Sequence, residues 1–255
     1  MERIGLPKLG PVARARRIAL LATRYFDCNP LRYRADRCYN PLAVGVTYLR
    51  NRLRFDAVAM PYGVIRVDPH SVCWNLGVPA KRWPIGLILD GDWDQRYRRP
   101  VDIAWKISAT KQRFVSGFEW EETDLFQRFY RPKFAKGERV RGTASLTELA
   151  DVYRRVYDPL FEAIREHGFL TPSIERPGVS FVYVHIDRNG EFMFTRGGNH
   201  RLGIALALRL RSMPVRVVTR HLAWQRVREE VKQGLRPATD FPDHPDLRDL
   251  RGEGS

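Results

Sequence analysis

The chain has 255 residues, of which 44% are hydrophobic and 11% aromatic, and its 44 Lys and Arg against 29 Asp and Glu give a net charge of +15. This composition excludes a disordered chain, because it provides enough apolar surface to form a core. No segment is predicted to span a membrane, since the longest apolar runs, 18–22 and 202–208, fall short of the roughly 20 residues required. Three widely spaced cysteines without a CxxC pair indicate reduced thiols in a cytoplasmic protein.

The basic charge is concentrated near the N-terminus. Residues 1–56 hold 12 Lys and Arg against 4 Asp and Glu, a net charge of +8. Residues 12–26 have the pattern of a basic amphipathic helix, and 47–55 form a second basic and aromatic segment. We therefore expect a basic, mostly helical N-terminal extension over residues 1–59. It either binds nucleic acid or another anionic surface, or packs on the following domain with its arginines in water.

Two short strands are predicted after this extension. Residues 63–69 alternate between apolar and polar side chains, and 85–91 form a second apolar run. Residues 113–129 mix aromatic and acidic side chains, which favours a loop followed by a short helix.

The acidic sequence DGDWD ends the second of these strands. The aspartates of residues 90–94 have the spacing of a calcium-binding loop, but Gln95 and Val101 stand where that loop needs glycine and glutamate. We therefore predict an acidic turn around a partly buried Trp93 in preference to a metal site.

The C-terminal half has clearer patterns. Ser145 and Glu148 form a capping box, and apolar residues at helical spacing predict a helix that ends at Gly168. Residues 181–187 alternate as a strand, and an Asn-Gly turn joins them to a return strand over 191–195.

A helix, a strand and a last helix complete this half. They are predicted over 202–210, 215–221 and 222–234, and the Pro- and Asp-rich residues 237–255 are predicted to form a flexible tail. The main domain is therefore expected to span residues 60–236.

The sequence TRGGNHRLGIAL, residues 195–206, has the features of an anion site. Two glycines ahead of a helix expose backbone N–H groups at the positive end of the helix dipole and allow a ligand to approach. Arg201 can direct two donors at a phosphate, and His200 can add a third. Glycines before a helix also make simple tight turns, and the chain has no GxxxxGK[ST] loop. The predicted nucleotide-binding residues are Gly197, Gly198, Asn199, His200 and Arg201.

The order of elements around this motif resembles the ParB/sulfiredoxin superfamily. The matching segments are IREHGFLTPSI, DRNGEFMF, GGNHRLGIALAL and PVRVVTRH, within residues 146–221. In that fold a glycine-rich signature ending in His-Arg or Arg-Arg opens a helix and holds nucleotide phosphates. The resemblance implies an α/β fold with a ParB/sulfiredoxin-like domain, and it says nothing about residues 1–60.

The differences from the superfamily signature indicate which group of its members the chain resembles most. Asn199 stands where sulfiredoxins have their catalytic cysteine, so repair of sulfinic acid is not expected. Chromosome-partitioning ParB proteins have a Glu-Arg-Arg signature and a following helix-turn-helix domain, whereas one helix and a tail follow Arg220. The motif is most similar to the Gly-His-His-Arg of free-serine-type small-molecule kinases, although Gly197 replaces their acidic residue.

This resemblance implies a protein that binds ATP or another nucleoside triphosphate with Mg²⁺, and a phosphotransferase or NTPase acting on a small molecule. Phosphoryl transfer needs a carboxylate that positions the acceptor hydroxyl. Asp68 is the candidate, with His200 as the second catalytic residue, and the alternative role of Asp68 is that of an Asp-Pro turn cap. Glu162 and Glu166 are predicted to lie on a solvated helix face, and no residue group has zinc-site spacing.

Two other functions stay open. The first is a non-catalytic, nucleotide-gated adaptor that holds nucleic acid or a protein partner through residues 1–56. The second is a scaffold in which the GGNHR segment has lost its ligand.

Overall fold

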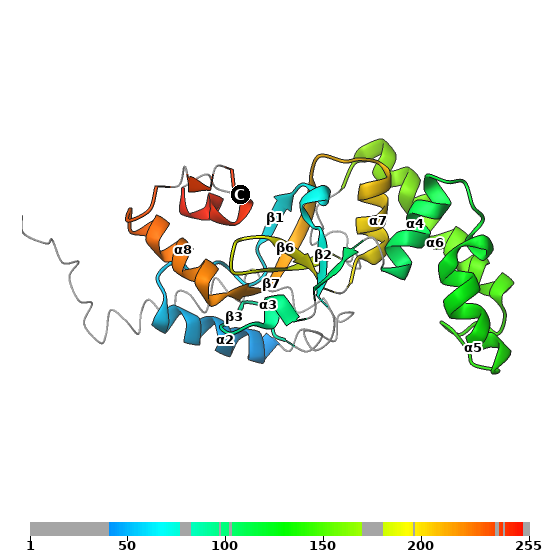
Figure 1. Ribbon diagram of the computed structural model, residues 1–255, viewed down its shortest axis with the longest axis horizontal. Coiled ribbons are helices and arrows are strands. Elements are labelled where there is room, and N and C mark those ends of the chain that lie inside the picture. Colours follow the sequence, from blue (N-terminus) through cyan, green and yellow to red (C-terminus); the bar gives the residue numbers. More distant parts are fainter. Residues whose placement is uncertain are drawn as a thin grey trace, which may run out of the picture.

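The protein has a mixed α/β fold (Figure 1). The computed structural model describes residues 41–76, 83–96, 98–101, 104–169, 181–195, 197–237, 240–241 and 243–251. The helix predicted over 12–26, and with it most of the predicted extension, lies outside these residues.

One mixed sheet of seven strands forms the centre of the molecule, in the order β1-β7-β5-β6-β2-β4, with β3 also pairing with β7. The strands are β1 (Val64–Val67), β2 (Trp74–Leu76), β3 (Leu87–Leu89), β4 (Arg98–Pro100), β5 (Val182–Ile186), β6 (Phe192–Phe194) and β7 (Met213–His221). β7 pairs antiparallel with β1 and parallel with β3 on one side, and parallel with β5 on the other.

β7 is an interior strand of the sheet, with β1 and β3 on one side and β5 on the other. All nine residues of β7 and all five of β5 are buried, as expected of strands that are covered on both faces. The strands predicted over 63–69, 85–91, 181–187, 191–195 and 215–221 are confirmed, with boundaries shifted by one or two residues. The three-residue strands β2 and β4 are too short to give a periodic pattern.

Helices surround this sheet. They are α2 (Pro41–Arg54), the 3-10 helix η1 (Pro69–Ser71), α3 (Trp93–Arg96), α4 (Trp105–Phe114), the 3-10 helix η4 (Trp120–Glu122), the π-helix η5 (Leu125–Tyr130), α5 (Arg131–Ala135), α6 (Leu146–His167), α7 (Asn199–Ala207), α8 (Leu222–Lys232) and the 3-10 helix η7 (Pro245–Leu250). None of these described helices is long and apolar enough to cross a bilayer.

α2 lies before the predicted domain boundary at residue 59 and packs into a core cluster of the domain. Its buried residues Val44 and Tyr48 pack in one cluster with Ile85, Phe181 and Tyr183. The many arginines of this region indicated a separate basic extension. However, among the arginines of α2, Arg50 and Arg54 are exposed and Arg52 is half-buried, on a helix whose other face is apolar.

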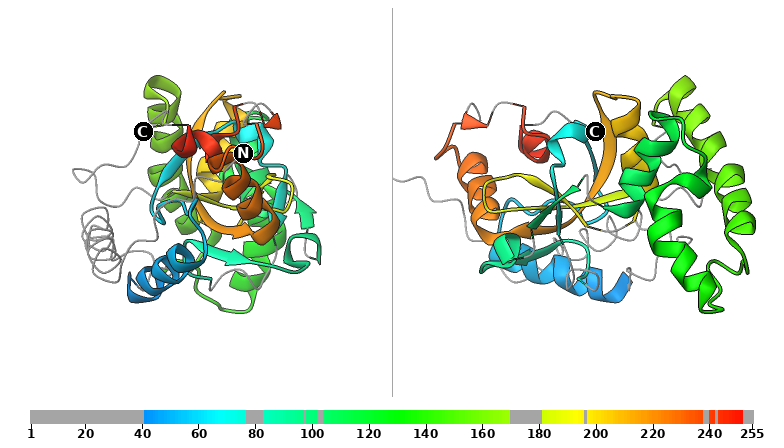
Figure 2. Two further views of the ribbon diagram at one scale, coloured as in Figure 1. Left: turned by 90° about the vertical axis from the view of Figure 1, so that its left-hand side faces the viewer. Right: turned by 45° about the vertical axis from the view of Figure 1, so that its right-hand side comes forward.

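A helical lobe made of α4, η4, η5, α5 and α6 lies at the end of the molecule opposite α8 and η7 (Figure 2). It has its own aromatic core around Trp120 and Tyr153. α6 confirms the predicted helix: Ser145 caps its start by accepting a hydrogen bond from the Glu148 N–H (3.2 Å), and Gly168 follows its end. α4 was not predicted, because it lacks a side-chain cap and buries only three residues.

The C-terminal segment is docked on the sheet, so the prediction of a flexible tail over 237–255 is wrong for its described part. Leu247 is fully buried and belongs to the main core. The Pro- and Asp-rich composition indicated a solvated tail, because a sequence does not show that an aspartate has a buried partner.

That partner is a pair of buried arginines. Asp246 accepts hydrogen bonds from Arg220 (Nε to Oδ2, 2.9 Å, with a second bond from Nη2) and from Trp224 Nε1 (3.0 Å). The Arg228 guanidinium lies 3.4 Å from the same carboxylate. Burial by itself raises the pKa of Asp246, but the charges of Arg220 and Arg228 outweigh it and hold this pKa well below its usual value.

Asp246→Asn is expected to lower the free energy of unfolding by about 3 kcal/mol, because removing one partner leaves buried charges uncompensated. The matched control is Asp243→Asn: Asp243 is exposed, has no ion pair within the described residues, and has a φ of +58° that asparagine tolerates. Urea unfolding measures both variants, and equal stability of the two would contradict this role of Asp246.

The same carboxylate makes stability depend on pH. Its contribution is complete above the unfolded-state pKa of about 4 and is lost as the pH falls through the lower folded-state pKa. Thermal unfolding between about pH 5 and pH 3 should therefore show a steeper loss of stability for the wild type than for Asp246→Asn.

Candidate functional site

The start of α7 leaves backbone donors without acceptors. Gly197 and Gly198 have φ angles of +82° and +72°, and no side chain caps the helix. The first bond of the helix is donated by the Leu202 N–H to the Gly198 carbonyl (2.8 Å). Within the described part of the chain, the N–H groups of residues 199–201 donate no hydrogen bond. Such orphan donors form an anion site when a helix end is left open.

Both glycines are required by close packing against β5. A Cβ on Gly198 would lie 2.6 Å from the Phe181 carbonyl oxygen and 2.9 Å from the Val182 Cα. A Cβ on Gly197 would lie 2.8 Å from the Tyr183 ring. The glycines therefore fix α7 against the sheet, whereas the sequence had suggested that they make room for a ligand.

Arg201 is half-buried in the first turn of α7. No carboxylate forms an ion pair or hydrogen bond with it among the residues that the structure describes. Burial lowers the pKa of its guanidinium, and no neighbouring charge opposes that shift. A partly desolvated cation without a counter-charge is unfavourable in the free protein and favourable for binding an anion.

His200 points away from solvent into the aromatic core of the helical lobe. It is 5% exposed, and its ring lies 3.9 Å from the Tyr157 ring and 5.3 Å from the Tyr153 ring between centroids. Its Nδ1 lies 3.1 Å from the Thr110 hydroxyl. His200 thus lies at the start of α7, as predicted, but on the face of the helix that is turned toward the core of the helical lobe.

The hydrogen bonds of Thr110 determine the His200 tautomer. The Thr110 hydroxyl donates its hydrogen to the Lys106 carbonyl (2.7 Å), so it accepts from His200 and Nδ1 carries the proton. Nε2 then has a free lone pair, and no donor reaches it among the described residues. His200 therefore does not donate to a phosphate from Nε2, contrary to the prediction.

The charges around His200 keep it neutral. Burial, followed by the nearby cations Lys106 and Arg141, lowers its pKa well below 6.5. Arg141 donates to the Tyr157 hydroxyl (3.0 Å) and lies over the Tyr153 ring, 5.0 Å from its centroid. A buried acceptor without a donor costs roughly 1–3 kcal/mol, which marks Nε2 as a position for a ligand hydroxyl or N–H group.

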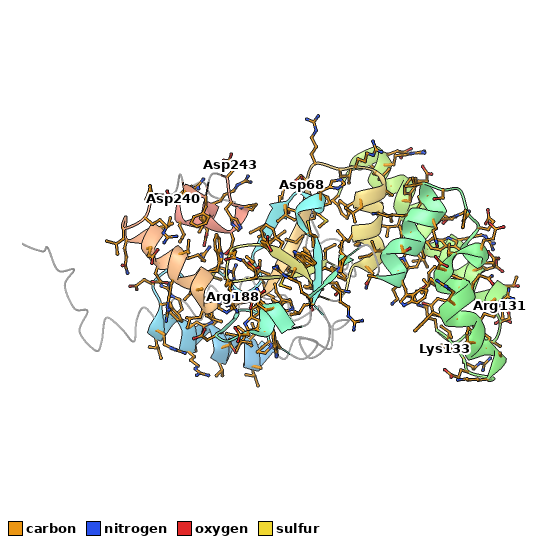
Figure 3. The ribbon with its side chains drawn as sticks, viewed as in Figure 1. Asp68, Arg131, Lys133, Arg188, Asp240 and Asp243 are labelled. Carbon is orange, nitrogen blue, oxygen red and sulfur yellow. The ribbon has the colours of Figure 1, made fainter. Side chains whose placement is uncertain are left out.

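Asp68 lies at a different place from the start of α7. Its side chain caps η1 by accepting a hydrogen bond from the His70 N–H (2.8 Å), as the Asp-Pro turn interpretation predicted. It is exposed and lines a cavity of about 670 Å³ to which none of residues 197–201 contributes. Figure 3 shows it on the same side of the molecule as the C-terminal aspartates. The charged residues of this cavity are Arg66, Asp68, Arg211, Asp240, Asp243 and Arg248.

The DGDWD segment is an acidic turn that binds Arg188, whose position is labelled in Figure 3. The Arg188 Nη2 atom lies 2.7 Å from Asp94 and 2.9 Å from Asp92. Burial raises the pKa of Asp94, but its hydrogen bonds from Arg188 prevail and lower it to about 2. Trp93 is half-buried beside this turn, as predicted, and the described residues contain no group of three side chains that could hold a metal ion.

The remaining candidates lie on the surface. Glu162 and Glu166 are exposed, Glu162 pairs with Arg165, and Glu166 lies 3.5 Å from His167 Nε2, which confirms the solvated helix face. Cys73 is exposed and free, while Cys28 and Cys38 lie outside the described residues.

Sequence reasoning missed the residues that surround His200. Thr110, Lys106, Arg141 and Tyr157 come from α4, α6 and the turn between α5 and α6. None of them belongs to a motif, and Thr110 is 90 residues away from His200 along the chain. The one unusual feature among these residues is the positive φ of Arg141 (+52°), and a sequence does not show a backbone angle.

No protein-family model matches the chain, and no curated protein or solved structure is significantly similar to it. The likeness to the ParB/sulfiredoxin superfamily therefore rests on the order of its elements and on the GGNHR segment.

Gly198→Ala is expected to lower the free energy of unfolding by about 2–4 kcal/mol, since a left-handed backbone and a clash with β5 add together. Gly234→Ala is the matched control. Its φ is +70°, yet no atom lies within 4 Å of the added Cβ, so it measures the backbone cost alone. Denaturant unfolding compares them, and equal losses would show that the contact with β5 is not limiting.

Proposed function

We propose that the protein binds a phosphate-bearing ligand, ATP or another nucleoside triphosphate, at the start of α7. The observation that carries this proposal is the combination of three unbonded N–H groups with the half-buried Arg201, which lacks an acidic partner among the described residues. The ParB/sulfiredoxin-like order of elements supports the same position for a nucleotide phosphate.

The binding energy would come from two sources. The N–H groups of residues 199–201 and the helix dipole favour an anion at the N-terminal end of α7. Arg201 adds a planar pair of donors. Because Arg201 is half-buried, it has already lost part of its hydration in the free protein. A polyphosphate would thereby satisfy donors that the protein itself leaves open.

His200 has a different role in this proposal. Its neutral Nε2 accepts a hydrogen bond from a hydroxyl or N–H of the ligand, and its low pKa makes it a weak base. Because Nε2 is covered by the aromatic core, a ligand reaches it only if the Tyr157 ring shifts. In this proposal His200 therefore recognises a group of the ligand by a hydrogen bond and does not transfer a proton.

We propose nucleotide binding at this site, and we do not extend the proposal to catalysis. Asp68, the predicted carboxylate for an acceptor hydroxyl, lines a cavity without residues of the GGNHR segment. No carboxylate pairs with residues 197–201 in the described chain, so Mg²⁺ would be held by the nucleotide phosphates. A phosphotransferase or NTPase would need a further group at the site, whereas a nucleotide-gated adaptor would not.

Arg201→Ala is expected to weaken nucleotide binding by roughly 10- to 100-fold, since a charge-assisted hydrogen bond contributes about 1.5–3 kcal/mol. Calorimetric titration with ATP, CTP and tripolyphosphate measures the loss and separates the contribution of the base from that of the phosphates. ATP turnover with a panel of hydroxylated metabolites then distinguishes an enzyme from an adaptor.

The matched control is Arg209→Asn, which removes a cation beyond the other end of α7. Asparagine is chosen because Arg209 has a φ of +51°. The control should bind nucleotides as the wild type does. Unchanged affinity of a folded Arg201→Ala protein would contradict the proposal, and so would an equal loss in both variants.

A further inference from the structure

Residues 125–141 form a basic arm at the tip of the helical lobe. The arm comprises η5, α5 and the turn before α6, and it lies at the end of the molecule away from α8 (Figures 1 and 2). It contains six Lys and Arg and one acidic residue, Glu138, so its net charge is +5. Arg131 and Lys133 mark its position in Figure 3.

The arm is held in place by the aromatic core of the lobe. Phe126 and Tyr130 of η5 are buried against Trp120 and Tyr153, and the Tyr130 and Tyr153 hydroxyls are 2.7 Å apart. π-Helical turns such as η5 are uncommon and occur frequently at functional sites. The basic side chains are therefore carried by a preformed scaffold.

Most of the positive charge of the arm is not neutralised. Arg131, Lys136 and Arg139 are exposed and form no ion pair with any described residue. Two further cations of the arm form long, exposed pairs, Arg128 with Asp124 at 3.9 Å and Lys133 with Glu138 at 3.5 Å. The sixth, Arg141, donates to the Tyr157 hydroxyl. Exposed pairs of this kind contribute little to stability, so stability does not explain the accumulation of charge.

An aromatic ring lies among these cations. Phe129 is 42% exposed, and it is the one exposed large hydrophobic residue of the arm. The Lys133 Nζ atom lies 5.1 Å from the centre of its ring. An exposed ring on a surface that also carries unpaired cations is the arrangement that proteins use to stack a nucleobase and hold its phosphates.

We infer that the basic arm binds single-stranded nucleic acid. Arg131, Lys136 and Arg139 would contact phosphates, and a base would stack on Phe129. A duplex hides the faces of its bases and would leave Phe129 unused. An anionic membrane requires an apolar helix face, which one exposed ring does not supply.

The test measures the affinity of the full chain for a fluorescein-labelled oligothymidylate by anisotropy, over a series of salt concentrations. The variant carries Arg131→Gln, Lys136→Gln and Arg139→Gln. The matched control carries Arg99→Gln, Arg155→Gln and Arg226→Gln, which removes the same charge from exposed residues elsewhere. Phe129→Ala tests the stacking, and thermal unfolding checks that each variant is folded.

The arm variant should bind about 10- to 100-fold more weakly than the wild type near 0.1 M salt, with a salt slope lower by about 2, because three phosphate contacts are lost. The control should change affinity by less than about threefold. Phe129→Ala should weaken binding by about fivefold or more and leave the salt slope unchanged.

Three results would overturn the inference. The first is an equal loss in the arm variant and the charge-matched control. The second is unchanged affinity of Phe129→Ala together with equal binding of a duplex. The third is arm-dependent binding to phosphatidylcholine–phosphatidylserine vesicles without binding to the oligonucleotide.

Discussion

The contact between Gly198 and β5 is the constraint on which the candidate site depends. Because the backbone of β5 occupies the position of a side chain at residue 198, α7 begins directly against the sheet. No residue that could cap the helix fits at this position, so the first N–H groups stay open. The same placement directs His200 into the helical lobe and puts Arg201 in the first turn. Packing thus leaves the start of α7 open, which is the feature that the proposed anion site uses.

The electrostatics of this site differ from those of the buried ion pairs of the protein. Arg220 faces the buried carboxylate of Asp246, and Arg188 faces that of Asp94. These pairs hold the C-terminal segment and the acidic turn on the sheet, and their carboxylates have lowered pKa values. Arg201 has no such partner among the described residues, although it is half-buried. A half-buried cation without a counter-charge is consistent with the proposal that an anion from outside binds there.

Local patterns were sufficient to predict much of the fold. Alternation predicted β1 and β5, and a capping box predicted α6, because these signals are contained in neighbouring residues. α4 and the docked C-terminal segment were missed, since their burial depends on partners elsewhere in the chain. The GGNHR segment was located from sequence, but the role of His200 was not, because its tautomer is set by Thr110 on α4. Likewise, only the structure shows that the glycines contact β5.

The most direct test of the account is the amide ¹⁵N–¹H spectrum of residues 199–201 during titration with ATP and with tripolyphosphate. If these N–H groups bind phosphate, their resonances should shift downfield with both ligands, and the shifts should be lost in Arg201→Ala but kept in Arg209→Asn. Hydrogen bonding to an anion explains that pattern because it acts on the donors themselves. Unchanged resonances of residues 199–201 at saturating nucleotide would contradict the account, even if the nucleotide binds elsewhere.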